Sequence, residues 1–139
     1  MPMPMEYKNA SEDFERFLKD ALDISALTTR NQVYTMVQAV FCVFRRRLDI
    51  DDALRFADVL PPVLRAIFVS DWSASEPRRP FESLGAMTKE AQSFRGEHNF
   101  SPDTCIRDVA AALRKNVDKA AFERVLASLP AEAAAFWRA

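Results

Sequence analysis

Apolar residues recur through most of the chain at the three- and four-residue spacing of amphipathic helices. The first such stripe predicts a helix over residues 11–23, capped by the Ser11 hydroxyl and opened by two carboxylates that face the positive end of the helix dipole. Thr29 and Gln32 then show the pattern of a capping box, which begins a second helix that extends to about Leu48. Its apolar stripe covers most of the helix circumference, so we expect this helix at the buried centre of the fold.

Comparison of the chain with itself reveals a longer pattern. Pro61, which follows a leucine, recurs as Pro130, and the difference between the two positions defines a fixed offset along the chain, 130 − 61 = 69. At the same offset Asp49 recurs as Asp118, and the surrounding positions match in polarity without a gap over about 35 residues. This match predicts a duplicated helical unit in which each aspartate caps a short helix and each proline opens the next one. The long helix of the second unit is predicted to begin at Ser101.

These patterns together predict an all-α fold class with about eight helices. We expect a single helical domain over residues 1–139, with two tandem, internally repeated units at about 11–70 and 84–138. A loop at 71–83 joins the two units, and their apolar stripes are expected to pack against each other in one core.

Composition and charge narrow the class of protein. Of the 139 residues, 49% are hydrophobic, and the formal net charge is -1. A chain of this length buries enough surface to fold without disulfides or a structural metal. Basic and acidic residues balance in both halves, so the basic excess of a nucleic-acid-binding domain is missing and we expect no nucleic-acid partner. The longest apolar runs are far shorter than a membrane-spanning helix, so we also expect no membrane partner.

Several kinds of site are excluded because the residue types that build them are missing. The two glycines, Gly85 and Gly96, are too few for a phosphate-binding loop or a dinucleotide fingerprint, and the single histidine, His98, excludes a multi-histidine zinc site. We therefore predict no catalytic residue, no cofactor and no metal ligand. Cys42 and Cys105 form no paired-cysteine motif, and the chain starts without a secretory signal pattern, so we expect free thiols in a reducing cytoplasm.

One possible reactive site combines His98 and Cys105. His98 lies between a predicted helix end and the next helix start, and Cys105 falls in the first turn of that helix, where the dipole favours a thiolate. Two nearby carboxylates, Asp103 and Asp108, oppose a thiolate. Cys105 also aligns with the apolar Met36 of the first unit, which favours a small buried residue.

The joining segment is the candidate partner surface. It combines Trp72, Arg78, Arg79 and Phe81 with stiffening prolines, and tryptophan and arginine are enriched at interface hot spots. The alternative is a linker in which Trp72 and Phe81 pack down on the core and hold the two units together.

The arginine run from Arg45 to Arg47 also has two interpretations. It could clamp an anion, but consecutive helical residues point about 100° apart and form no flat patch. Cations that offset the negative end of the central helix explain the run more simply.

Several stretches resemble a known family. They are the opening segment to Tyr7, Phe44 to Leu48, Leu54 to Pro62, Ala66 to Trp72 and Glu97 to Asp103. Together they are similar to bacterial proteins of domain-of-unknown-function family 2267, and the similarity covers nearly the whole chain. The resemblance implies an all-helical fold and a bacterial cytoplasmic setting. It brings no activity, cofactor or catalytic residue.

The function is therefore unknown from the sequence, and two classes stay open. The first is a non-catalytic cytoplasmic protein-interaction module whose partner is an unknown protein or, in a homodimer, a second copy of the chain. The second is a small-molecule-binding protein or enzyme with a cleft near His98 and Cys105. A third interpretation, nucleic-acid binding through the arginines, predicts a steep salt dependence but lacks the charge excess.

Overall fold

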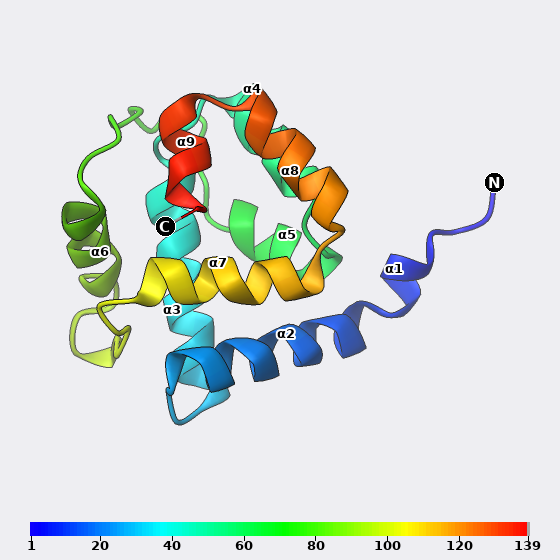
Figure 1. The fold of residues 1–139 in the computed structure, drawn as a ribbon, viewed down its shortest axis with the longest axis horizontal. Helices are drawn as coiled ribbons and strands as arrows, with labels where there is room; N and C mark the ends of the chain where they lie inside the picture. The colour runs from blue at the N-terminus through cyan, green and yellow to red at the C-terminus, as the bar shows by residue number, and fades with distance from the viewer. Residues whose placement is uncertain (139) are drawn as a thin grey trace.

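The computed structural model describes residues 1–138, which form helices and no strand (Figure 1). The helices are α1 (Met5–Lys8), α2 (Ala10–Ser25), α3 (Arg30–Arg45), α4 (Ile50–Asp58), α5 (Pro62–Val69), α6 (Leu84–Gln92), the short 3-10 helix η1 (Gly96–His98), α7 (Cys105–Asn116), α8 (Lys119–Ser128) and α9 (Ala131–Phe136). The predicted all-α fold class is confirmed. The short helix α1 was not anticipated by the hydrophobic pattern.

Three predicted helix starts are confirmed by their caps. The Thr29 hydroxyl accepts a hydrogen bond from the Gln32 backbone amide at 3.2 Å, and the Gln32 side chain accepts one from the Thr29 amide, which completes the capping box of α3. Asp49 caps α4 by accepting from an amide at 2.8 Å, and Asp118 caps α8 in the same way at 3.1 Å. Each cap satisfies an amide that has no partner inside its own helix.

The predicted caps at Ser11 and Ser101 are wrong. Helix α2 begins at Ala10 with Asn9 as its N-cap residue, so Ser11 already lies inside the helix. The Ser101 hydroxyl instead donates to the side chain of Asn99, and α7 begins only at Cys105. At Ser101 the Asn99 side chain takes the hydroxyl that was expected to cap the helix, whereas at Ser11 the helix begins earlier in the chain.

The two halves of the chain pack across each other. Helix α2 lies along α7, and α6 lies along α3, so the leading helix of each half contacts the long helix of the other half (Figure 1). The long helices α3 and α7 contact each other, as do the short helices α4 and α8. The start of α8 follows the start of α4 by the offset found in the sequence, and α9 follows α5 by the same offset. Common descent of the two units stays a prediction.

The core is one continuous cluster of buried apolar side chains from both halves. Phe44 lies in its aromatic centre, with ring centroids 4.8 Å from Phe56, 4.9 Å from Phe136 and 5.1 Å from Trp137. All four side chains are buried, which places α3 at the centre of the fold as predicted. No helix within residues 1–138 combines the length and apolar character needed to span a membrane.

Candidate functional site

The segment 70–83 leaves α5 and crosses the end of α3 before it enters α6. Trp72 and Phe81 are half-buried against the core, whereas Arg78 and Arg79 are exposed. The Arg79 amide donates to the Arg46 carbonyl at 2.9 Å, which holds the middle of the segment on the helix end. Two of the four residues predicted as a partner surface are thus partly used in packing, and both arginines remain at the surface.

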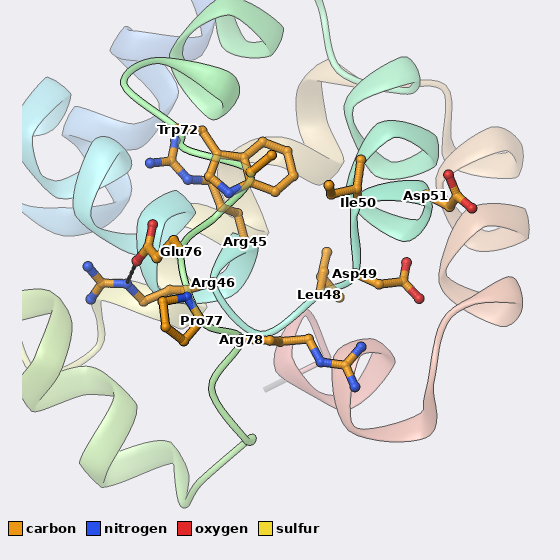
Figure 2. Close-up of a pocket in the computed structure, with 11 residues that line it drawn as sticks. Arg45, Arg46, Leu48, Asp49, Ile50, Asp51, Trp72, Glu76, Pro77 and Arg78 are labelled. Carbon is orange, nitrogen blue, oxygen red and sulfur yellow. Dashed lines mark ion pairs between the residues drawn. The ribbon is translucent and has the colours of Figure 1, made fainter.

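A cleft of about 460 Å³ opens between this segment, the end of α3 and the start of α4 (Figure 2). Trp72 and Pro77 of the segment and Ile50 of α4 supply apolar walls. The charged side chains that line it are three arginines and three carboxylates: Arg45, Arg46, Arg78, Asp49, Asp51 and Glu76. Of the four residues predicted as a partner surface, Trp72 and Arg78 line this cleft.

Arg45 contributes a buried cation to the cleft. Its residue is 6% exposed, and its Nη1 donates to the carbonyl oxygens of Phe68 and Ser70, both at 2.8 Å. The guanidinium lies 5.7 Å from the centroid of the Trp72 ring, in the geometry of a cation–π contact. Among the ion pairs formed within residues 1–138, none involves Arg45. Its direct partners are therefore dipoles and an aromatic face, with no carboxylate in ion-pair contact.

The other two arginines of the run surround Glu90 of α6. Arg47 has a fully buried side chain and reaches Glu90 Oε1 at 2.8 Å, while Arg46 Nη1 reaches Oε2 at 3.0 Å. Arg79 adds a longer contact at 3.5 Å. Hydrogen bonds from Arg47, helped by Arg46, lower the pKa of Glu90 to about 2, so this carboxylate stays ionised at neutral pH.

Sequence reasoning missed Glu90, although the apolar residues Met87 and Ala91 at helical spacing around it are a weak signal in the sequence. Its helical neighbours Met87 and Ala91 are both buried, which places the carboxylate beside the apolar face of α6. A carboxylate in that position needs a buried cation. Arg47 also donates to the Val43 carbonyl at 2.7 Å. This bond agrees with the interpretation that the arginines 45–47 stabilise the C-terminal end of the central helix.

His98 and Cys105 lie in different surroundings. His98 is exposed on η1 and lines a hollow of about 520 Å³ with Tyr34, Arg95 and Phe100. The Cys105 side chain is buried and does not line that hollow. Burial, with a smaller effect from nearby carboxylates, raises the pKa of the Cys105 thiol to about 11.

Within residues 1–138, no three histidine, cysteine, aspartate or glutamate side chains gather into a group that could hold a metal ion. The cleft beside segment 70–83 offers charged, hydrogen-bonding and apolar groups to a ligand. An arginine fork suits a planar carboxylate, and an aromatic ring suits apolar side chains.

The helical fold and the stretches that resemble a known family point to the same class of protein. Residues 14–136 match the family described as "Uncharacterized conserved protein (DUF2267)", and the chain belongs to this family. No curated protein matches the chain.

Proposed function

We propose that this chain is a non-catalytic protein-interaction module that binds its partner in the cleft beside segment 70–83. The observation that carries the proposal is the composition of this cleft. Trp72 and Pro77 form an apolar wall next to Arg45 and Arg78, neither of which forms an ion pair within residues 1–138. Aromatic residues and arginine are the types that contribute most to protein–protein binding energy.

The balance of charge favours a protein partner over a nucleic acid. Asp49, Asp51 and Glu76 line the same cleft as the arginines, so a phosphate backbone would meet repulsion along with attraction. A protein surface carries both signs of charge and can match such a mixture.

The family resemblance and the two free cysteines support a bacterial cytoplasmic setting, which forms part of this proposal.

Affinity capture from extracts of the source cells tests the function. Immobilised wild-type chain is compared with Arg78→Glu, which reverses a charge at the cleft, and with the control Arg124→Glu. Arg124 is equally an exposed arginine and lies on α8, outside the cleft. We expect a protein that wild type and the control retain and that Arg78→Glu loses. Equal capture by all three chains, or by none, contradicts the proposal.

The alternative of a reactive thiol has a direct test of its own. Because the Cys105 pKa is raised to about 11 by burial, the folded protein should be alkylated by iodoacetamide at Cys105 more slowly than a small model thiol at pH 8. Mass spectrometry of the modified peptides separates Cys105 from Cys42. Faster modification of Cys105 would support the enzyme alternative.

A further inference from the structure

The hollow that contains His98 lies at the N-terminal end of α3, and we call it the η1 hollow. Its volume of about 520 Å³ is within the range of small-molecule sites in proteins. The cleft beside segment 70–83 lies at the opposite, C-terminal end of α3, and the two share no lining residue (Figure 1). The residues that line the η1 hollow come from the first two turns of α3 and from the segment between α6 and α7: Asn31, Gln32, Tyr34, Thr35, Arg95, His98 and Phe100.

Aromatic rings form a large part of the wall of the η1 hollow, since Tyr34, His98 and Phe100 all line it. Of the 11 phenylalanines, all of which lie within residues 1–138, Phe100 alone is exposed, at 58%. The backbone beside it is held in place, because the Asn99 side chain donates to a carbonyl of α6 at 2.8 Å and accepts from the Ser101 amide at 3.0 Å. Aromatic faces in such a wall favour contact with a flat apolar group of a ligand.

Arg95 supplies the one permanent charge among the residues that line the η1 hollow. Its guanidinium carbon lies 5.8 Å from the centroid of the Tyr34 ring, in a cation–π contact that holds the cation at the hollow without neutralising it. Arg95 forms no ion pair within residues 1–138. No carboxylate lines the η1 hollow, whereas three line the cleft beside segment 70–83. A ligand with one carboxylate would therefore supply the only counter-charge at this site.

Neutral side chains of α3 add hydrogen-bonding groups to the η1 hollow. The Gln32 side-chain oxygen accepts from the backbone amides of Thr28 and Thr29 at 2.8 Å and 3.2 Å, which fixes the orientation of this side chain. Its nitrogen is left as the end that can donate to a ligand. The exposed Asn31 and the half-buried Tyr34 bring an amide and a hydroxyl to the same hollow. Such neutral donors can bind a carboxylate oxygen without adding a second positive charge.

The backbone at Arg95 places this cation at the hollow. Arg95 has φ 60° and ψ 15°, and Gly96 follows with φ 51°, so two consecutive residues adopt the left-handed conformation. They turn the chain from the end of α6 into η1, which brings Arg95 and His98 to the same hollow. Glycine and asparagine adopt this conformation more readily than arginine does. An asparagine at position 95 can therefore remove the charge and keep the turn.

We infer that the η1 hollow binds a small aromatic monocarboxylate, with its carboxylate on the Arg95 guanidinium and its ring against Phe100 and His98. One cation without a lining acid matches one negative charge, whereas a polyphosphate would bring charges that have no partner there. The hollow includes His98 but not Cys105, so the inference concerns binding and no chemical reaction. It goes beyond the proposed function, because it concerns the other end of α3.

Titration of the isotope-labelled full chain with trans-cinnamate, an aromatic monocarboxylate, tests the inference. NMR spectra of the backbone amides give both the dissociation constant and the location of the ligand. Trans-cinnamamide keeps the ring without the charge, and hexanoate keeps the charge without the ring. We expect cinnamate to bind with a Kd of about 1 mM or tighter and to shift the amides of residues 31–35 and 95–100. It should bind at least about tenfold more tightly than cinnamamide, because its bond to Arg95 is charge-assisted, and more tightly than hexanoate.

Two variants separate the ionic contact from the ring contact. Arg95→Asn removes the guanidinium with a residue that tolerates the left-handed backbone, and Phe100→Ala removes the exposed ring. The matched controls are Arg124→Asn on α8 and Leu84→Ala at the start of α6, which change exposed side chains outside the η1 hollow. Circular dichroism confirms that each variant is folded.

Arg95→Asn should weaken cinnamate binding at least about tenfold and reduce the preference for cinnamate over cinnamamide to about twofold or less. Phe100→Ala should weaken both ligands by a similar factor of about three to ten, because both lose the same ring contact. Both controls should bind cinnamate as wild type does. The inference is overturned by a wild type that does not bind cinnamate or binds cinnamamide equally well, by shifts confined to another surface, or by an Arg95→Asn variant that binds cinnamate normally.

Discussion

At the C-terminal ends of the two long helices, α3 and α7, an arginine side chain makes the same kind of hydrogen bond. Arg45 donates to the Phe68 carbonyl, and its counterpart Arg114 donates to the carbonyl of Trp137, which is the counterpart of Phe68 at the same offset. In each half, an arginine near the end of the long helix therefore ties down the last turn of the closing helix. Arg–carbonyl hydrogen bonds of this kind satisfy acceptors that a helix end leaves open.

The next residues show how the two ends diverge. Arg47 donates to the Val43 carbonyl at 2.7 Å, and its counterpart Asn116 donates to the Ala112 carbonyl at 2.8 Å. The side-chain partners of these two residues differ. Arg47 donates to the ionised Glu90, whereas the neutral Asn116 donates to Asp20 at 2.9 Å. The same helix-end geometry thus supports a buried ionic cluster in the first half and a single amide–carboxylate bond in the second.

The cleft depends on this difference between the two ends. The ionic cluster holds segment 70–83 over the end of α3, through Arg46 with Glu76 at 3.4 Å and Arg79 with Glu90 at 3.5 Å. With Arg46 and Arg47 occupied by carboxylates, Arg45 is left beside the cleft with carbonyl partners only. The second half pairs the corresponding Arg114 with Glu123.

The largest expected effect concerns the core that both halves share. Phe41 is fully buried, with its ring 5.4 Å from Phe68 and 6.3 Å from Trp137, the two counterpart residues of the closing helices. Phe41→Ala should lower the free energy of unfolding by about 3–5 kcal/mol, because it opens a cavity between the halves. Urea denaturation measures this, and a change within experimental error would contradict the central position of α3.

The second-largest expected effect compares the stability that a carboxylate contributes at the end of α3 with the stability that one contributes at the end of α7. Glu90→Gln leaves the fully buried Arg47 side chain with only the half-exposed Glu82, 4.0 Å away, as a counter-charge, and should cost about 3 kcal/mol. The matched change Asp20→Asn, which faces a neutral amide, should cost about 1 kcal/mol or less. Equal losses in urea denaturation would show that the two ends are electrostatically alike.

Acid should selectively weaken the ion pairs of Glu90 at the C-terminal end of α3. The pKa of Glu90 is lowered to about 2 in the folded protein from its ordinary value of 4.5, so its stabilising effect is complete above pH 4.5 and is lost as the pH falls toward 2. Thermal unfolding followed between pH 6 and pH 2.5 should show a steeper fall in Tm for wild type than for Glu90→Gln. Parallel curves for the two proteins would contradict the lowered pKa.

The smallest effect is expected at the second end. Glu123 is half-exposed and pairs with Arg114 at 3.7 Å and Arg138 at 3.1 Å. Glu123→Gln should change the free energy of unfolding by less than about 1 kcal/mol, because exposed ion pairs are weak in water. A loss as large as that of Glu90→Gln would remove the contrast between the two ends.

Local signals in the sequence were sufficient for part of this fold. The caps of Thr29, Asp49 and Asp118 were predictable because each cap joins groups three residues apart, so the bond depends on neighbours in the chain. The failed cap at Ser101 shows the limit of such signals. Its hydroxyl had a second local partner in the Asn99 side chain, and composition alone does not rank the two.

The candidate site was only half predictable for a related reason. Trp72 and Arg78 stood out because they combine interface-type residues with an irregular segment. Glu90 did not stand out in the sequence, since its role depends on Arg47, which lies 43 positions earlier in the chain. The separation of His98 from Cys105 likewise depends on which side of α7 faces the core.

The sequence by itself determined that this protein is helical, where most helices begin, and which stripes are apolar, because these properties depend on spacing within a turn or two of chain. The tertiary structure alone decided that α2 lies on α7 and α6 on α3, that Glu90 neutralises Arg47, and that Arg45 is left facing a cleft without a carboxylate partner. These relations join residues distant in sequence. The partner of a buried charge is chosen by packing, since burial makes an unpaired charge costly wherever its partner lies along the chain.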